Sequence, residues 1–346
     1  MTESISSRRL FTTADDRTGA LEIGGIIARQ GWQIPVGPHA DDATCCVVDL
    51  ASRHIKSEEA FECVLEAHQR QADYRCHKMD AGLRGNWPHE IHALVELGYR
   101  VAVVASFPDA GRRCKDGVVY IQDVPVLESP FGADPLTAPC SSKPIEVLEE
   151  AGCVFDEVEI WDANDNDELN QATYRSLEED RVLIGPAGAV GSYAAHLFGK
   201  PTPAQIKLEL PMLVVCGSLN ATSREQLDLV VGNHFQLGDD LGEFGDVTVL
   251  ATPVPKGPIS NSDAEAMAAQ VAKAVKACSH KVATLVLVGG DTVAALVGDE
   301  TLFVRGTVEA GIPVSSFGNQ TLISKGGGIG TADSLRRIIE LASPQH

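Results

Sequence analysis

Short apolar runs alternate along the whole chain with longer stretches that have a helical pattern. Several of the runs are apolar throughout, as is typical of strands that are covered on both faces. After the first run, Ala20, Ile23 and Ile27 share one helix face. The alternation predicts an α/β fold in which helices flank largely parallel sheets. We expect strands at Leu10–Thr13, Cys45–Leu50, Val101–Ala105, Val158–Trp161, Arg181–Ile184, Met212–Cys216, Val247–Leu250, Thr284–Val288 and Pro313–Ser316.

Proline and glycine indicate one break in this pattern. Gly199-Lys-Pro-Thr-Pro203 and Pro211 bracket a polar passage between two apolar stretches. A length of 346 residues suits two domains. We therefore expect one domain at residues 1–205 and a second at residues 206–346, each with a largely parallel sheet flanked by helices.

Composition then narrows the classes of function. Lys and Arg number 28 and Asp and Glu number 48, so the net charge is −20. Phosphate backbones and anionic lipids repel so acidic a chain, and we expect neither a nucleic-acid nor a membrane partner. No apolar run approaches the roughly 20 residues of a membrane span, and residues 1–9 are polar. The nine scattered cysteines form no CxxC pair, which favours reduced thiols in a cytoplasmic protein.

Two adjacent carboxylates follow the first expected strand, in Ala14-Asp-Asp-Arg-Thr-Gly19. The carboxyl ends of strands are where open α/β sheets place their sites. There Asp16, or with less support Asp15, could take a proton from a substrate hydroxyl or hold a metal. One of them could instead cap the following helix. The sequence assigns no set of metal ligands.

Cations gather in the two segments that come next. Asp49-Leu-Ala-Ser-Arg53 follows the second expected strand, and a guanidinium can bind a carboxylate through two parallel hydrogen bonds. In Lys78–Asn86, charged residues stand among glycines that permit close approach of a ligand. Both segments predict a site for a small anionic, hydroxylated substrate, with a charged surface turn as the alternative. The substrate-binding residues that we predict are Arg53, Lys78, Asp80, Arg84 and Asn86.

Three glycine-rich turns occur in the second part of the chain, at Gly217-Ser218, Gly289–Thr292 and Lys325–Gly330, each before an expected helix. The free N–H groups of a helix N-terminus bind phosphate, and glycine lets the ligand approach. Three such turns favour a polyphosphate site, although no GxxxxGK[ST] motif occurs. Ordinary tight turns are the alternative. The nucleotide-binding residues that we predict are Ser218, Gly289, Gly290, Asp291, Thr292, Lys325 and Gly327.

Taken in order, these motifs resemble the four-carbon acid sugar kinase family, also called DUF1537. The family's ADDLTGA, DTDSR and KKIDSTLRGN segments correspond to Ala14–Ala20, Asp49–Arg53 and His77–Asn86. Its later segments correspond to Pro125–Pro139 and to the three glycine-rich turns. The chain departs from the family at Ala51, which stands near the place of the second Asp of DTDSR. It also has Ala81-Gly82 where the family has Ser-Thr.

The resemblance implies a kinase that uses ATP and Mg²⁺ to phosphorylate the terminal hydroxyl of threonate, erythronate or 3-oxo-tetronate. It implies a sugar-acid domain followed by a nucleotide domain, with the active site in the cleft between the domains. It also suggests a homodimer, the commonest oligomer. Because of the departures, a non-catalytic protein that binds a nucleotide or sugar acid and regulates a partner is the alternative. A nicotinamide dehydrogenase is disfavoured, because no strand leads into GxGxxG.

Overall fold

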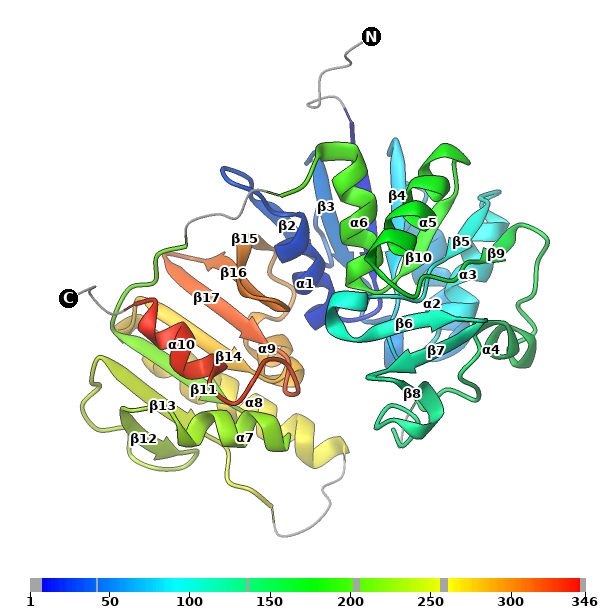
Figure 1. Cartoon of the computed structure of the whole chain (residues 1–346). Coiled ribbons are helices and arrows are strands. Elements are labelled where there is room, and N and C mark those ends of the chain that lie inside the picture. Colours follow the sequence, from blue (N-terminus) through cyan, green and yellow to red (C-terminus); the bar gives the residue numbers. More distant parts are fainter. Residues whose placement is uncertain (1–7, 42, 135–136, 202–205, 256–260, 343–346) are drawn as a thin grey trace. The chain divides into compact units, whose positions relative to one another are not determined.

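The computed structural model describes residues 8–41, 43–134, 137–201, 206–255 and 261–342 (Figure 1). The chain divides into two compact units, one of residues 1–27 and 35–201 and one of residues 28–34 and 202–346. The expected boundary between residues 205 and 206 borders residues 202–205, which lie outside the described residues. Each unit has a buried apolar core of its own.

Parallel strands form the centre of the first unit, in the spatial order β2-β3-β1-β4-β10-β5-β9. The order reverses at β1, because the chain passes from β1 to β3 on one side and then to β4 on the other. Such a reversal leaves a crevice at the carboxyl ends of the strands, where α/β proteins bind ligands. The strands are β1 (Leu10–Ala14), β2 (Ile34–Gly37), β3 (Cys45–Asp49), β4 (Tyr74–Lys78), β5 (Val101–Val103), β9 (Val158–Ile160) and β10 (Val182–Gly185).

Helices cover both faces of this sheet (Figure 1). On one face α1 (Arg17–Ile27), α5 (Asn166–Glu178) and α6 (Ala187–Phe198) pack together, and on the other α2 (Ser57–Ala67) packs against α3 (Trp87–Glu96). Right-handed crossovers explain which helices lie on which face. The chain moves along the sheet in one direction from β1 to β3 and in the opposite direction from β3 to β4 and from β4 to β5, so the connecting helices lie on opposite faces.

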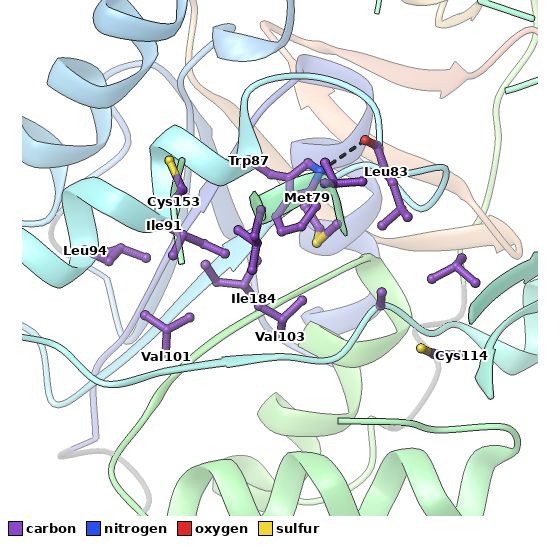
Figure 2. Packing of buried hydrophobic residues seen from close by; sticks show 14 of the residues in the cluster. Met79, Leu83, Trp87, Ile91, Leu94, Val101, Val103, Cys114, Cys153 and Ile184 are labelled. Carbon is purple, nitrogen blue, oxygen red and sulfur yellow. Dashed lines mark hydrogen bonds between the residues drawn. The ribbon is translucent and has the colours of Figure 1, made fainter. Parts of the chain in front are cut away.

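The core of the first unit packs α3 against β5 and β10 (Figure 2). Met79, Leu83 and Trp87 are completely or almost completely buried, and the indole N–H of Trp87 donates to the carbonyl of Leu83 at 3.1 Å. Asp80 and Arg84 directly follow Met79 and Leu83 in the sequence. The buried side chains therefore fix where these two polar side chains emerge. A small antiparallel sheet and one more helix complete the unit, namely β6 (Arg112–Lys115), β7 (Val118–Ile121), β8 (Val124–Pro125) and α4 (Pro144–Glu150).

The second unit has a mixed sheet, in which β12-β13-β11-β14-β17 are parallel and β16 and β15 continue the order antiparallel. The order reverses at β11, which has β13 on one side and β14 on the other. A second crevice at the carboxyl ends of strands follows from this topology. The strands are β11 (Met212–Cys216), β12 (Asn233–Gln236), β13 (Val247–Ala251), β14 (Thr284–Val288), β15 (Leu302–Glu309), β16 (Ile312–Phe317) and β17 (Gln320–Lys325).

Helices also cover both faces of the second sheet (Figure 1). On one face α7 (Ala221–Asp228) contacts α10 (Ser334–Glu340), and on the other α8 (Asn261–Cys278) contacts α9 (Gly290–Val297). The expected α/β fold with flanking helices and largely parallel sheets is confirmed. Each expected strand is present within two residues of its expected ends. The strands that were not expected are β2, β4, β6, β7, β8, β12, β15 and β17, and polar residues interrupt β4 and β17 among them.

Candidate active site

The carboxyl ends of β1, β3 and β4 bring the predicted acidic and basic residues together. Ala14 at the end of β1 pairs in register with Asp49 of β3 and with Lys78 of β4. Asp15 comes next, and its backbone N–H donates to the carbonyl of Lys78 at 3.3 Å. Its carbonyl accepts from the backbone N–H of Arg53 at 3.1 Å. The three segments are therefore held to one another by the backbone itself.

Asp15, Asp16, Arg53 and Lys78 form a compact charged group, which we call the aspartate cluster. Arg53 donates from Nε to Asp15 Oδ2 at 2.7 Å, and from Nη2 to Asp15 Oδ1 at 2.9 Å and Asp16 Oδ1 at 2.8 Å. Lys78 Nζ donates to Oδ1 of Asp15 at 3.1 Å and of Asp16 at 3.0 Å. The side chain of Asp15 is 3% exposed and that of Asp16 is 26% exposed.

The charges of the cluster stabilise one another strongly. Burial opposes ionisation of Asp16, but the positive charges of Lys78 and Arg53 outweigh it and lower the pKa of this carboxyl. Burial likewise opposes the charge on Lys78, and Asp15 and Asp16 outweigh it and raise the pKa of the ammonium group. The pKa of Arg53 is raised for the same reason.

Asp16 keeps one carboxylate oxygen available to a ligand. Its Oδ1 accepts from Arg53, from Lys78 and from the backbone N–H of Gly19 at 3.1 Å, so Asp16 also caps the start of α1. Its Oδ2 has no partner among the residues that the structure describes. The capping and catalytic interpretations are therefore compatible, and the catalytic role stays a prediction.

Carboxylates hold the guanidinium of Arg84. Its Nε and Nη2 donate to Asp80 at 2.9 and 2.8 Å, and its Nη1 donates to Asp134 at 2.7 Å. Burial opposes ionisation of Asp80, but Arg84, Arg53 and Lys78 outweigh it and lower its pKa to about 2. These contacts leave Arg84 few donors for a substrate, so the substrate-binding roles of Arg84 and Asp80 stay predictions.

The ring of Phe131 lies against Arg84, with 4.7 Å from the guanidinium carbon to the ring centroid. The same ring fills the space beside Gly82, where an added Cβ would overlap it. The absence of a side chain at position 82 is thus matched by an aromatic ring from a distant part of the sequence. Because a Thr at position 82 would meet this ring, the departure from the family pattern is structurally coherent.

Asn86 braces the turn that carries Arg53. Its amide group donates to the carbonyls of Ser52 at 2.7 Å and Ile55 at 2.8 Å, which uses both amide hydrogens. Such a residue positions Arg53 through the backbone, and its predicted contact with substrate remains untested.

Three further charged residues next to the cluster had no role assigned from the sequence. Arg17 Nε donates to Asp49 Oδ2 at 2.6 Å, and burial raises the pKa of Asp49. Both residues stand within the motifs that pointed to Asp16 and Arg53, so the motifs carried a signal for them. Asp134 stands within the segment Pro125–Pro139 and pairs with Arg84 across 50 positions of sequence, so the motif indicates the residue but no local pattern indicates the pair.

Gly19 permits the approach of Lys78 to the cluster. A Cβ at Gly19 would overlap Lys78 Nζ and lie 2.5 Å from Asp16 Oδ1. We predict that Gly19→Ala displaces the ammonium group and lowers turnover about tenfold or more, since small displacements at a reacting centre are costly. Steady-state kinetics should show this, with Gly242→Ala, where an added Cβ meets only ordinary contacts, retaining normal turnover. Normal turnover in Gly19→Ala would contradict the role given to Lys78.

An apolar cavity of about 710 Å³ opens elsewhere in the first unit, among α4, β9 and α5. Leu148, Phe155 and Trp161 contribute to its lining. Its one basic side chain, Arg175, pairs with Glu159 at 3.3 Å and with Glu179 at 2.6 Å. The aspartate cluster, which offers open donors and an open acceptor, suits a hydroxylated acid better.

In the second unit, the three predicted glycine-rich turns leave the same edge of the sheet. Cys216 at the end of β11 pairs in register with Val288 of β14, which pairs in turn with Lys325 of β17. The backbone N–H of Ser218 donates to the carbonyl of Val288 at 3.2 Å, and that of Gly289 to the carbonyl of Lys325 at 2.9 Å. The turns therefore meet at the reversal point of this sheet.

Glycine is required where these turns touch. A Cβ at Gly217 would overlap the side chain of Thr292, and one at Gly327 would overlap the side chain of Ser218. Gly289 has a φ of 119°, which other residues rarely adopt, and its added Cβ would lie 3.2 Å from the backbone nitrogen of Ser218. The glycines thus keep open the space between the turns.

A cavity of about 240 Å³ lies among these turns and α8. Helix α9 begins in its wall at Gly290, and no side chain caps the first N–H groups of that helix. Apolar side chains of α8 line another part, namely Ala264, Met267, Ala268 and Val271. The predicted nucleotide-binding residues that line the cavity are Ser218, Gly289, Gly290, Asp291, Thr292 and Gly327.

Lys325 lies at the end of β17 and is buried. Its ammonium group donates to the carbonyls of Gly326 at 3.0 Å and Gly327 at 3.4 Å. Burial lowers the pKa of Lys325 to about 8. Lys325 thus places a positive charge behind the last glycine-rich turn. It loses this charge at a lower pH than an ordinary lysine does.

Among the described residues, no group of three or more His, Cys, Asp or Glu side chains is placed to hold a metal ion. Mg²⁺ commonly binds through one or two carboxylates together with substrate phosphates, so a dedicated cluster is not required. Asp291 is a carboxylate that lines the cavity of the second unit. Within the same described part of the chain, no helix combines the length and apolar character needed to cross a membrane.

Comparison with known proteins identifies the family. A family model described as a sugar-binding N-terminal domain matches residues 10–184, which is half of the chain. The D-threonate kinase of Salmonella typhimurium is 25% identical over an alignment that covers 64% of this chain and 60% of that protein. The chain belongs to the four-carbon acid sugar kinase family.

Two other members of the four-carbon acid sugar kinase family are comparably similar. The D-erythronate kinase of Heliobacterium modesticaldum is 25% identical over an alignment that covers 63% of this chain and 59% of that protein. The D-threonate kinase of Bordetella bronchiseptica is 25% identical over an alignment that covers 94% of this chain and 95% of that protein. The chain thus spans about 60% of the length of the Salmonella and Heliobacterium relatives that it matches.

Solved structures share the fold of this family member. A DUF1537 protein of Haemophilus influenzae has a TM-score of 0.72 and 19% identity, over 95% of this chain and 98% of that chain. A Salmonella typhimurium LT2 protein described as a tRNA synthase has a TM-score of 0.79 and 16% identity, over the same shares of both chains. At these identities the likeness establishes the α/β fold alone.

Proposed function

We propose that this family member is an ATP-dependent kinase that phosphorylates the terminal hydroxyl of a four-carbon sugar acid. The observation that carries the proposal is the open Oδ2 of Asp16 beside two buried cations. The names of the relatives support D-threonate and D-erythronate as candidate acids. The sequence resemblance adds 3-oxo-tetronate to that set, and a homodimer stays a prediction.

The aspartate cluster has both kinds of group that a hydroxy acid needs. Nη1 of Arg53 and one N–H of Lys78 have no partner among the described residues, and both can bind oxygens of an anion. Oδ2 of Asp16 can accept a hydrogen bond from a hydroxyl group. The cluster can therefore orient a hydroxyl and also neutralise negative charge that builds up beside it.

Arg53 and Lys78 keep Asp16 ionised and thereby make it a weak base. A weak base is sufficient for phosphoryl transfer, since the transition state is loose and catalysis depends on positioning and electrostatics. Asp16 would orient the substrate hydroxyl and take its proton as the new phosphorus–oxygen bond forms. Asp15, which receives two hydrogen bonds from Arg53, would hold the two cations in place.

The second unit would hold the nucleotide. The backbone N–H groups at the start of α9 and the hydroxyls of Ser218 and Thr292 suit phosphate oxygens, and the apolar residues of α8 suit a base. When bound, Mg-ATP supplies the phosphoryl group and part of the charge neutralisation, with Asp291 as a carboxylate for the metal. Transfer requires reacting atoms about 3–3.5 Å apart, and an active site between the two domains stays a prediction.

Lys325 gives a prediction of pH dependence. Its charge favours a bound polyphosphate, and because its pKa is about 8, the charge is present below pH 8 and is lost as the pH rises through that value. We therefore expect the KM for ATP to rise several-fold between about pH 7 and about pH 9. Lys325→Met should show a higher KM at neutral pH with no such rise. A wild-type KM that is constant over this range would exclude the role.

Steady-state release of ADP from Mg-ATP tests the proposed function. We expect release that depends on at least one of the three acids. The second candidate is a non-catalytic binding protein, which is favoured by the ion pairs that hold Arg84 between two carboxylates and by the ring beside Gly82. It predicts that ATP and an acid raise the melting temperature without release of ADP. That result would contradict the kinase.

A further inference from the structure

A continuous chain of buried hydrogen bonds lies beneath the aspartate cluster. Thr13 Oγ1 is 2.8 Å from His68 Nε2 and 2.8 Å from His77 Nδ1. His77 Nε2 is 2.9 Å from Glu90 Oε2, and the hydroxyl of Ser52 donates to Glu90 Oε1. All five side chains are completely buried. We call Thr13, His68, His77, Glu90 and Ser52 the buried chain.

Two arrangements of protons connect every member. In both, His77 Nε2–H donates to Glu90. In one, His77 Nδ1 also donates to the Thr13 hydroxyl, which donates to Nε2 of His68; in the other, the Thr13 hydroxyl donates to Nδ1 of a neutral His77 and accepts from His68 Nε2–H. Burial opposes ionisation of Glu90, but the charge and hydrogen bond of His77 and the hydrogen bond of Ser52 lower its pKa. The buried chain therefore contains a carboxylate that has no exposure to solvent and is held by His77 and Ser52.

Members of the buried chain stand next to the groups of the aspartate cluster. Ser52 directly precedes Arg53 in the sequence. On β4, which pairs with β1, His77 directly precedes Lys78. Thr13 pairs in register with His77, two residues before Asp15. Movement of any of these side chains would therefore shift a cation or carboxylate of the cluster.

Stability alone does not explain a polar chain in this position. A buried charged group is often no more stabilising than apolar residues of similar volume, because removing charge from water is costly. The face of β1 around it is otherwise apolar, with Phe11 and Val48 in the same small core. A directional network fixes side-chain positions more narrowly than apolar packing would, and these positions adjoin the charged groups of the site.

We propose that the buried chain is a positioning network that holds Arg53 and Lys78 in register with Asp15 and Asp16. The inference rests on the proposed function, because it assigns the aspartate cluster to the sugar acid. In this proposal the side chains of Thr13, His77, Glu90 and Ser52 do not contact the substrate. It also predicts different effects on the two substrates. Loss of a hydrogen bond in the buried chain should lower kcat/KM for the acid and leave KM for ATP unchanged.

Substitutions of Thr13 test this role against plain packing. Thr13→Val keeps the shape and removes the hydroxyl, whereas Thr13→Ser keeps the hydroxyl and removes a methyl group. The matched control is Thr173→Val, because Thr173 is also completely buried in this unit and its hydroxyl bonds Ser192 at 2.8 Å and His196 at 3.2 Å. The readouts are melting temperature, kcat/KM for the acid and KM for ATP.

We expect Thr13→Val to lower kcat/KM for the acid about tenfold or more, with KM for ATP unchanged. Thr13→Ser should restore most of that loss, and Thr173→Val should lower the melting temperature without changing kcat/KM. The proposal would be overturned if Thr13→Ser lowered kcat/KM for the acid as much as Thr13→Val does. It would also be overturned if Thr173→Val did so.

Ser52→Ala provides a second variant, which removes only the hydrogen bond to Glu90. Its control is Ser176→Ala, where the buried hydroxyl donates to the carbonyl of Arg181. Only Ser52→Ala should weaken the acid-dependent step. If wild-type protein releases no ADP with any acid, the proposed function fails, and calorimetric binding of D-threonate to the same variants becomes the readout. Binding that is equal in wild type, Thr13→Val and Ser52→Ala, including an equal lack of it, would overturn the positioning role.

Discussion

Asp16→Asn is expected to lower kcat for the sugar acid by about 100-fold or more. The open Oδ2 is the only acceptor that Asp16 has left among the described residues, and an amide at this position cannot take up a proton. The amide would also place a donor beside the cations, which weakens the orientation of the hydroxyl. Steady-state release of ADP at saturating ATP and acid measures the effect, with folding checked by the melting temperature.

The control for this prediction is Asp167→Asn, the same substitution at an exposed position on α5. It should retain wild-type turnover. Asp15→Asn offers a further comparison, because Asp15 is nearly buried and bonded to Arg53 and Lys78. We expect it to cost stability as well as turnover. Near-normal kcat in Asp16→Asn would remove Asp16 from the proposed role.

Lys78→Met is expected to destabilise the protein by about 3–5 kcal/mol, the usual cost of breaking a buried ion pair. The substitution leaves Asp15 and Asp16 close together with only Arg53 to balance them. Turnover should also be lost, because one of the open donors is removed. Urea unfolding at neutral pH measures the change in the free energy of unfolding.

The same variant has a defined pH dependence. In the wild type the pKa of Asp16 lies below its ordinary value of 3.8. The ion pairs of Asp16 therefore stabilise the fold fully above about pH 4, and this stabilisation is lost as the pH falls through the lowered pKa. The difference between wild type and Lys78→Met should therefore shrink below about pH 4. Lys143→Met, which breaks an exposed pair with Glu146, should leave the melting temperature unchanged. A Lys78→Met variant as stable as wild type would contradict the account of the cluster.

Most of the strands that are apolar throughout could be predicted from the sequence, whereas the short β2 and the more polar β4 and β17 were not. β4 is central in its sheet, yet it reads Tyr-Arg-Cys-His-Lys. His77 is tolerated there because Thr13 and Glu90 satisfy both of its ring nitrogens. Those partners come from β1 and α3, so no local pattern could indicate that the segment is a strand.

The residues of the candidate site could be predicted from the sequence, but the ion pairs among them could not. The motifs indicated Asp16, Arg53, Lys78 and Arg84 together, and the register of β1 with β3 and β4 brings the first three into contact. Which cations face a ligand depends on carboxylates elsewhere in the chain. Arg84 is taken up by Asp80 and by the distant Asp134, and only the fold reveals this.

Phosphorus NMR of the reaction product is the most direct test of the central claim. Wild-type protein would be incubated with Mg-ATP and, in separate samples, with D-threonate, D-erythronate and 3-oxo-tetronate, with Asp16→Asn as the control. The account predicts a new phosphomonoester signal with at least one acid, formed together with ADP and greatly reduced in the control. ADP with inorganic phosphate alone, or no reaction with any of the acids, would contradict it.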